Sequence, residues 1–446
     1  MENDSRGARA ISPPTQEGLV RGIRRWDLVA VAINGIIGAG IFGLPAKTFS
    51  LIGTYSLFAF IACALVVTLI ILCFAEVGSR FEETGGPYLY AREAFGPTVA
   101  FEVGWLIWLA RLTAFAANCN LMVAYLAFFW PPAASTIPRA FIITIVVVGL
   151  TALNITGVRQ AAIASNVFTI GKLVPLLYFI LAGIFFIVVF RPNSFVFGPT
   201  PSTGAFSQSV LLLIYAFTGF EMAAIPAGET RDPRRYLPRA LLIAIGVVAV
   251  VYVLVQIVCI GALPGLADST KPLADAAQRF RGATGAAIIS AGAIISIVGN
   301  LNIILLSGSR VPFAIAEQKQ LPRFVGNIHR RFSTPHVSIL ITAALMFILT
   351  LNSSFVAALT ISAIARLVTY AATCLALPVL RQKKDVPEAV FRVRGGTVVA
   401  IACLVLIVWL LLNSTLYEAI VAASAAAVGF VIYLAYRQSA KAERKK

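Results

Sequence analysis

The sequence predicts an all-α polytopic membrane protein whose first ten spans form two inverted halves of five, followed by two additional C-terminal spans. Composition is the first observation: 59% of the 446 residues are hydrophobic and only 12% are charged, whereas soluble domains carry about 25% charged residues. The second is a series of twelve apolar runs, each close to the ~20 residues that a membrane-crossing helix needs. The third is that the first and sixth runs are interrupted by glycine and proline in the same way.

The twelve apolar runs fill almost the whole chain and leave no polar block large enough for a second domain. No secretory signal is expected, because the first apolar run lacks a small-residue cleavage site and many more runs follow it. We assign residues 1–27 to an N-terminal segment, 28–190 to a first repeat, 206–380 to a second repeat, 397–436 to spans 11 and 12, and 437–446 to a tail. The expected spans are 28–50, 54–79, 97–129, 138–157, 161–190, 206–229, 238–263, 283–316, 336–351, 354–380, 397–413 and 416–436.

The distribution of Lys and Arg predicts the orientation of the spans. Of the 36 Lys and Arg residues, 27 lie in the termini and in the alternate loops that share a side with them, six lie on the opposite side and three lie within spans. Cytoplasmic loops carry the excess of Lys and Arg, so we expect both termini to be cytoplasmic and the protein to lie in the cytoplasmic (inner) membrane. This bias accounts for the net charge of +17 and argues against a nucleic-acid partner. No obligate protein partner is evident.

The sequence shows no catalytic or metal-binding constellation, and we do not expect an enzyme. All six cysteines fall inside apolar runs without metal-ligand or disulfide spacing and are interpreted as small core residues. The two histidines, His329 and His336, share one polar connection. The run Gly38–Gly43 matches the G-x-G-x-x-G pattern, but no acid follows at the ~20-residue distance that a dinucleotide fold requires. We expect no cofactor and no metal.

The first apolar run contains the residues that least favour an unbroken helix. Residues 30–46 read AVAINGIIGAGIFGLPA, with four glycines and then Pro45. In hydrocarbon no water satisfies freed backbone groups, so a broken helix is tolerated only beside protein or a polar cavity. A half-helix that begins near Gly40 would direct its N–H groups at an anionic group such as a carboxylate. The alternative is that these glycines only permit close helix packing.

The sixth run repeats the pattern of glycine and then proline that interrupts the first run. Residues 211–229 read LLLIYAFTGFEMAAIPAGE, with Gly219 in mid-run and Pro226 a few residues later. The two interrupted runs lie five spans apart, and because five is an odd number the two halves enter the membrane from opposite faces. This arrangement indicates an inverted-repeat transporter with its site at the bilayer midplane, between the halves. A channel is not expected to show paired broken helices.

Several motifs resemble those of the amino acid–polyamine–organocation (APC) superfamily. They are Gly35–Phe42 (GIIGAGIF), Tyr215–Glu221 (YAFTGFE), Glu82–Tyr88 (EETGGPY) and Ser309-Arg310. The resemblance covers nearly the whole chain and is greatest to the twelve-span bacterial members. It implies a LeuT-type fold of five plus five inverted helices with two additional helices, and a secondary transporter that moves an amino acid by alternating access.

The resemblance also implies where the substrate binds. The N–H groups around Ala39, Gly40 and Ile41, next to Gly38, would bind the substrate carboxylate, and the carbonyl of Ile36 would accept from the α-amino group. Thr218 and Gly219 would offer unwound carbonyls to the amine. Tyr215 would close over the substrate as a gate, although an aromatic residue at this depth is as often a packing residue. Ile303 stands where some relatives carry a bulky aromatic gate residue.

Lys172 lies about 18 Å into a span that starts near residue 161, close to the middle of a ~30 Å hydrocarbon core. The segment Asn166–Lys172 resembles a subset of the family in which a lysine occupies the place of a sodium ion. By that resemblance, Lys172 would bridge the carbonyls of span 1 and a hydroxyl of span 8, Ser307. Our hypothesis is that its proton couples to uptake and that transport is sodium-independent. The alternative is a permanently charged strut in an exchanger.

Three further ionisable residues lie within spans, where such groups are costly and usually functional. Glu221 is interpreted either as a gating or proton-linked acid or as a structural anchor for the broken helix. For Arg111 and Arg366, pairing with carbonyls or with an acid is favoured over contact with the substrate. The apolar residues Ala39, Phe220 and Ile303 favour a neutral amino acid as substrate.

Overall fold

The computed structural model describes residues 23–443 except 84, 157, 192–193, 226, 228–229 and 333, and describes only the backbone of residues 158–170, 418 and 437–443. Most of the predicted N-terminal segment and the last three residues of the predicted tail therefore lie outside the described residues. Within the described part, the only β pairing is an isolated bridge between Ile23 and Thr230. Everything else is helix or connection, as the sequence predicts.

The α-helices account for all twelve expected spans, with a few additional short elements. Span 1 is divided between two helices, and α4 is the short helix that follows span 2. In chain order the helices are α1 (Arg25–Ile36), α2 (Gly40–Ile52), α3 (Ser56–Gly78), α4 (Pro87–Phe95), α5 (Pro97–Leu126), α6 (Thr136–Thr156), α7 (Val158–Phe190), α8 (Thr203–Phe217), α9 (Pro233–Ala262), α10 (Pro272–Glu317), α11 (His336–Asn352), α12 (Phe355–Gln382), α13 (Gly396–Leu412) and α14 (Leu416–Glu443).

The prediction of a polytopic membrane protein is confirmed. Among the described residues, nine helical segments are long and apolar enough to cross a membrane, and α11 and α13 are apolar but only 17 residues long. A 17-residue helix measures about 26 Å, at the lower limit for a membrane span. Gly282 has φ 61° and ψ −155°, which is not helical, so α10 consists of a short first segment and a long span.

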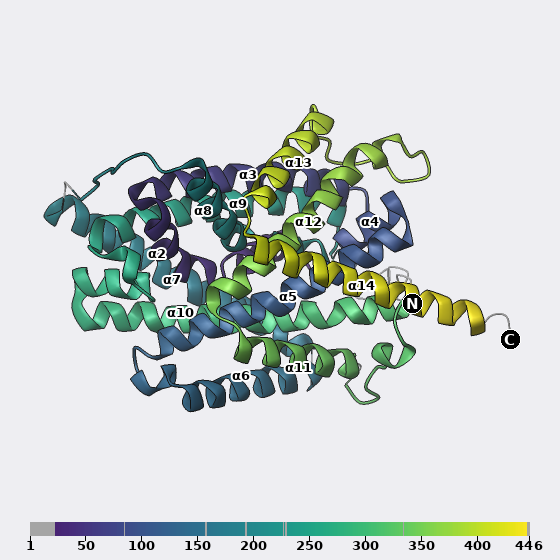
Figure 1. Ribbon diagram of the computed structural model, residues 1–446, viewed down its shortest axis with the longest axis horizontal. Helices are drawn as coiled ribbons and strands as arrows, with labels where there is room; N and C mark the ends of the chain where they lie inside the picture. The colour runs from purple at the N-terminus through teal and green to yellow at the C-terminus, as the bar shows by residue number, and fades with distance from the viewer. Residues whose placement is uncertain are drawn as a thin grey trace, which may run out of the picture.

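The helices surround a central group formed by α5, α10 and α12, which pack closely against one another or against shared neighbours. Figure 1 shows α5, α6, α10 and α11 on one side of the molecule and α3, α8, α9 and α13 on the other. Large apolar side chains point outward: on α7, Leu181, Phe185 and Val188 are 66–70% exposed, whereas Phe179 is fully buried. An apolar outer surface of this extent is expected where lipid replaces water.

Candidate functional site

The first interruption lies between α1 and α2. α1 ends at Ile36, Ile37 is extended (φ −73°, ψ 94°), and α2 begins at Gly40, the residue where the sequence predicts a half-helix. The N–H of Ala39 donates to Oδ1 of Asn118 on α5 at 3.1 Å. In the described part of the chain, the N–H groups of Gly40 and Ile41 have no acceptor, as expected for the first turn of a helix.

The second interruption follows α8. The helix ends at Phe217, Thr218 is extended (φ −86°, ψ 167°), and Gly219 has a φ of 109°, which only glycine adopts without strain. The chain continues as a short 3₁₀ helix, η3 (Phe220–Ala223). The predicted interruption at Gly219 is therefore present, whereas Pro226 and Glu229 lie outside the described residues.

The backbones of the two interruptions pack directly against each other. A Cβ atom on Gly35 would lie 2.6 Å from the carbonyl oxygen of Gly219, and a Cβ atom on Gly219 would collide with the carbonyl oxygen of Gly35. A Cβ atom on Gly40 would lie 2.6 Å from Cα of Ala216 on α8. The glycines therefore serve both purposes considered from the sequence, because they interrupt the helices and also permit close packing.

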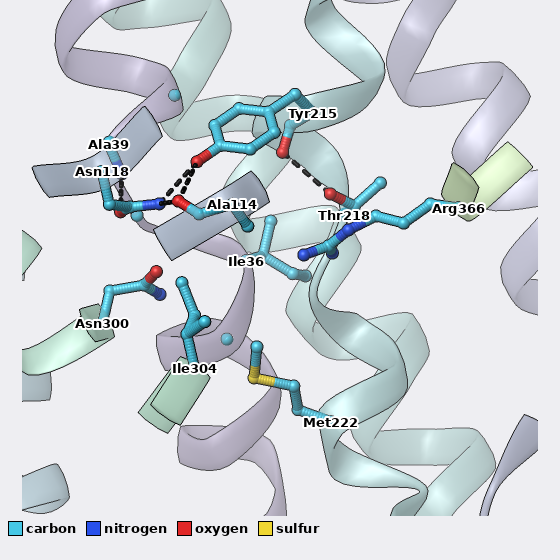
Figure 2. Close-up of a pocket in the computed structure, with 13 residues that line it drawn as sticks. Ile36, Ala39, Ala114, Asn118, Tyr215, Thr218, Met222, Asn300, Ile304 and Arg366 are labelled. Carbon is cyan, nitrogen blue, oxygen red and sulfur yellow. Dashed lines mark hydrogen bonds between the residues drawn. The ribbon is translucent and has the colours of Figure 1, made fainter. Parts of the chain in front are cut away.

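A small cavity of about 20 Å³ lies between the interruptions (Figure 2). Its walls come from both ends of the first interruption, from α8 and the second interruption, and from α5, α10 and α12. The lining residues are Gly35, Ile36, Gly38, Ala39, Gly40, Ala114, Asn118, Tyr215, Thr218, Met222, Asn300, Ile304 and Arg366. A pocket bounded by broken helices offers backbone groups that an unbroken helix would not release.

Asn118 connects the two sides of the cavity. Its Nδ2 donates to the Ala114 carbonyl at 2.7 Å and to the hydroxyl of Tyr215 at 2.5 Å, while its Oδ1 accepts from Ala39 (Figure 2). The hydroxyl of Tyr252 on α9 lies 3.2 Å from both the Ile36 and the Ala216 carbonyl oxygens. Side chains of the protein itself therefore occupy part of the hydrogen-bonding capacity of the interruptions.

A sequence model described as amino acid permease matches residues 23–435. The chain belongs to the amino acid permease family. The permease is 29% identical over 407 residues to the uncharacterized transporter Rv1999c of Mycobacterium tuberculosis, covering 90% of this chain and 88% of that protein. It is also 29% identical over 350 residues to the serine/threonine exchanger SteT of Bacillus subtilis, covering 76% of this chain and 78% of that protein. The prediction of an APC superfamily transporter rather than an enzyme is confirmed.

Lys172 of the permease reaches the first interruption from α7. Its ammonium donates to the Ile37 carbonyl at 2.8 Å and to the backbone carbonyl of Asn34 at 3.3 Å, and it also contacts the side-chain oxygen of Asn34. Lys172 is fully buried. Span 1 carbonyls therefore surround the ammonium, as the family resemblance implies, but the side chain of Asn34 was not anticipated.

Ser307 does not take part in this contact, so its expected position beside Lys172 is wrong. Its hydroxyl donates to the carbonyl of Ile303 at 2.8 Å, one turn earlier in α10. The reason is local, because a serine hydroxyl within a helix readily bonds the carbonyl four residues before it. The residues that carry the family motif before Lys172, 166–170, have side chains outside the described residues.

Glu221 lies at the centre of a buried ion cluster that we call the Glu221 cluster, formed by Glu221, Arg111, Arg366 and Tyr370. Its Oε1 lies 3.2 Å from NH2 of Arg111 and 2.9 Å from NH1 of Arg366. Its Oε2 accepts from the hydroxyl of Tyr370 at 2.7 Å and from the N–H of Gly219 at 2.9 Å. Both arginines pair with an acid, as favoured from the sequence, and Glu221 contacts the second interruption through the N–H of Gly219.

The remaining predicted site residues divide into two groups. Ile36, Gly38, Ala39, Gly40, Tyr215 and Thr218 line the cavity, whereas Ile41, Gly219 and Ile303 do not. Ile303 lies one position before Ile304, which does line the cavity, because a one-residue step rotates a side chain by about 100° around a helix axis. The hydroxyl of Thr218 donates to the Tyr215 carbonyl at 2.9 Å and so helps to terminate α8.

Sequence reasoning missed Ala114, Asn118, Asn300, Ile304 and Met222 as lining residues. A Cβ atom on Gly38 would lie 3.0 Å from Oδ1 of Asn300, so this amide packs directly on the first interruption. The signal that could have indicated Asn118 and Asn300 is their polarity, since amide side chains within spans need hydrogen-bond partners. No comparable signal exists for Ile304 or Met222, which are ordinary apolar residues in apolar runs.

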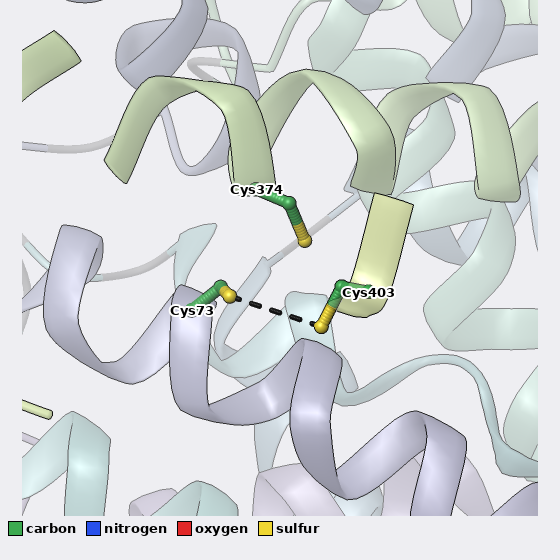
Figure 3. A group of neighbouring side chains, drawn as sticks. All are labelled: Cys73, Cys374 and Cys403. Carbon is green, nitrogen blue, oxygen red and sulfur yellow. Dashed lines mark hydrogen bonds between the residues drawn. The ribbon is translucent and has the colours of Figure 1, made fainter. Parts of the chain in front are cut away.

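Three of the six cysteines meet at one place, which the sequence spacing does not show. Cys73 on α3, Cys374 on α12 and Cys403 on α13 have sulfur atoms within 4.8 Å of one another, and Cys73 and Cys403 are 4.0 Å apart (Figure 3). All three are buried, and none of them lines the cavity. We interpret them, as from the sequence, as small residues that let three helices pack closely.

Proposed function

We propose that this permease is a secondary active transporter that moves an amino acid by alternating access, with the substrate backbone held between the two interrupted helices. The observation that supports this most is the cavity between the interruptions. Its walls include Gly40, at the start of α2, and the extended Thr218, and the N–H of Gly40 has no acceptor among the described residues. A zwitterionic amino acid needs N–H donors for its carboxylate and carbonyl acceptors for its amino group, and interrupted helices offer both.

In this proposal the substrate carboxylate binds the N–H groups at the start of α2, and the α-amino group binds the carbonyl of Ile36. Asn118 now accepts from Ala39, so a bound carboxylate displaces the Asn118 oxygen or shares that N–H with it. Because Asn118 also holds the hydroxyl of Tyr215, this exchange transmits substrate binding to Tyr215, the proposed gate. Glu221 acts as the anchor of the second interruption.

We further propose that transport is sodium-independent, with the ammonium of Lys172 in the place of sodium and its proton coupled to uptake. The contacts of Lys172 with the Asn34 and Ile37 carbonyls support this assignment. The second candidate is an exchanger in which Lys172 is a permanent strut, and the name of the relative SteT favours it. Both versions use a LeuT-type inverted repeat in the cytoplasmic membrane with both termini cytoplasmic.

Counterflow of labelled amino acids in proteoliposomes tests transport, and a pH gradient with and without sodium tests coupling. We expect saturable, stereoselective flux that an inward proton gradient accelerates and that sodium does not change. Lys172→Gln should abolish the proton dependence, whereas Lys47→Gln, in α2, is the matched control and should retain it. Uptake that occurs only into vesicles preloaded with amino acid would favour the exchanger, and non-saturable flux would contradict a transporter.

A further inference from the structure

Among the described residues, the buried charges around the cavity do not balance. Six charged residues are buried in the described part of the chain, and two of them, Glu76 and Arg80, lie at the end of α3. The other four, Arg111, Lys172, Glu221 and Arg366, surround the two interruptions. These four comprise three cations and a single anion. An unbalanced charge within a membrane is costly and usually marks a ligand pathway.

Glu221 has no remaining capacity to balance the two arginines. One carboxylate oxygen is shared between Arg111 and Arg366, and the other accepts from Tyr370 and from the Gly219 N–H. NH2 of Arg111 is close enough for an ion pair but lacks hydrogen-bond geometry, and NH1 of Arg111 has no hydrogen-bond partner among the described residues. One carboxylate therefore faces two guanidinium groups.

Arg366 is the member of the Glu221 cluster that a ligand reaches. It lines the cavity, whereas Arg111, Glu221 and Tyr370 do not. Figure 2 shows its guanidinium directed from α12 toward Ile36 and Thr218. Arg366 is 5% exposed, and its buried Nε has no hydrogen-bond partner among the described residues. A buried, partly unsatisfied guanidinium that faces a cavity is suited to a carboxylate, which it binds with two parallel hydrogen bonds.

We propose that the substrate is an amino acid with a negatively charged side chain, such as aspartate or glutamate, and that Arg366 recognises the side-chain carboxylate. This rests on the proposed function, because it names the substrate class of the same cavity. A neutral amino acid is a zwitterion and leaves the excess positive charge in place, whereas an acidic one removes a unit of it. Of the three apolar residues that favoured a neutral substrate, only Ala39 lines the cavity.

The test compares substrates of nearly equal shape and different charge. Purified full-length permease is reconstituted into proteoliposomes, and uptake of labelled glutamate and aspartate is measured against that of glutamine and asparagine. We expect the acidic amino acids to have at least a tenfold higher kcat/KM than the amides. In detergent, glutamate should raise the thermal unfolding midpoint of the protein, and glutamine at the same concentration should raise it less.

Substitutions at Arg366 test whether this residue determines the preference for acidic amino acids. Arg366→Gln leaves Glu221 paired one-to-one with Arg111 and is expected to fold; it should lower the ratio of glutamate to glutamine uptake at least tenfold. Arg366→Lys, which keeps the positive charge but not the planar fork, should lower that ratio less than Arg366→Gln does. Arg235→Gln removes the same charge from a side chain that is 68% exposed and should leave the ratio unchanged.

The outcomes separate this inference from the proposed function. Transport of neutral amino acids in preference to acidic ones would overturn the inference and leave the proposed function intact. An acidic preference that persists in Arg366→Gln would overturn the role of Arg366. Absence of flux and of thermal stabilisation with every amino acid would overturn both. If Arg366→Gln fails to fold, the charge preference of the unmodified protein still decides the substrate class.

Discussion

Two buried carboxylates, Glu76 and Glu221, both pair with arginine, but only one of the pairings is balanced. Glu76 lies near the end of α3 and forms a two-bond pair with Arg381, from Nε to Oε1 at 2.6 Å and from NH2 to Oε2 at 2.7 Å. The N–H of Val393 also donates to Oε2 at 2.8 Å. One anion, one bidentate cation and one backbone donor form a self-contained connection between α3, α12 and the loop before α13.

Glu221 instead pairs with two arginines, Arg111 and Arg366. This cluster also lies beside the cavity. Arg381 has a side chain that is 17% exposed and reaches solvent, whereas the side chains of Arg111 and Arg366 are 1% and 6% exposed. The Glu76 pair, complete without any ligand, fits a structural role. The Glu221 cluster keeps a surplus of buried positive charge at the place where the helices are interrupted, which fits a role in ligand binding.

The largest effect should come from Glu221→Gln. It removes the carboxylate that pairs with both Arg111 and Arg366, and breaking a buried pair by removing one partner costs about 3–5 kcal/mol. We expect a loss of that size in the free energy of unfolding, measured by denaturant titration in detergent, together with loss of uptake. A smaller loss than in Glu76→Gln would contradict the assignment of surplus positive charge to the Glu221 cluster.

Glu76→Gln should destabilise the protein less, by about 2–3 kcal/mol, because Arg381 is partly exposed and keeps the carbonyl of Val393 as an acceptor at 2.8 Å. The same denaturant titration measures this loss. Because the pair lies apart from the cavity, the ratio of glutamate to glutamine uptake should equal that of the unmodified protein. A changed ratio would show that Glu76 is coupled to the cavity and does not serve a structural role alone.

The sequence predicted the parts of this arrangement that depend on local pattern. The lengths of the apolar runs predict the spans. The glycines at 35–43 and at 219 predict both interruptions, because helix termination is decided within a few residues. The ion pairs could not be predicted with their partners. Glu76 and Arg381 are 305 residues apart, and their meeting depends on how each helix is rotated, which apolar runs on lipid-facing helices leave unspecified.

Rotation also explains the errors at the site. Ile303 rather than Ile304 was expected at the cavity, and Ser307 rather than Asn34 was expected to complete the Lys172 contact. Each error concerns which side of a helix a residue occupies. The depth predicted for Lys172 follows from its position in the run alone, and its ammonium contacts the span 1 carbonyls of Asn34 and Ile37.

Tyr370→Phe tests how much hydrogen bonding, rather than charge, stabilises the Glu221 cluster. It removes one hydroxyl donor from Oε2 of Glu221, which keeps the Gly219 N–H, and leaves all charges unchanged. A hydrogen bond to a charged group contributes about 1.5–3 kcal/mol, and we expect the lower end because the second donor remains. Denaturant titration measures the loss, and the acidic preference in uptake should persist. A loss as large as that of Glu221→Gln would mean that hydrogen bonding rather than charge stabilises the cluster.

The smallest effect should come from Arg381→Lys. Lysine keeps the positive charge beside Glu76 but replaces the planar fork by a compact ammonium, so it cannot hold both carboxylate oxygens and the Val393 carbonyl in the same geometry. The expected loss in the free energy of unfolding is about 1 kcal/mol, the contribution of one ordinary hydrogen bond.

Arg366→Lys is the matched exchange in the unbalanced cluster. If a balanced pair only supports the fold, Arg381→Lys should change the unfolding midpoint and not the glutamate-to-glutamine ratio, whereas Arg366→Lys should change the ratio more than the midpoint. The reverse pattern would assign the ligand-binding role to the wrong arginine.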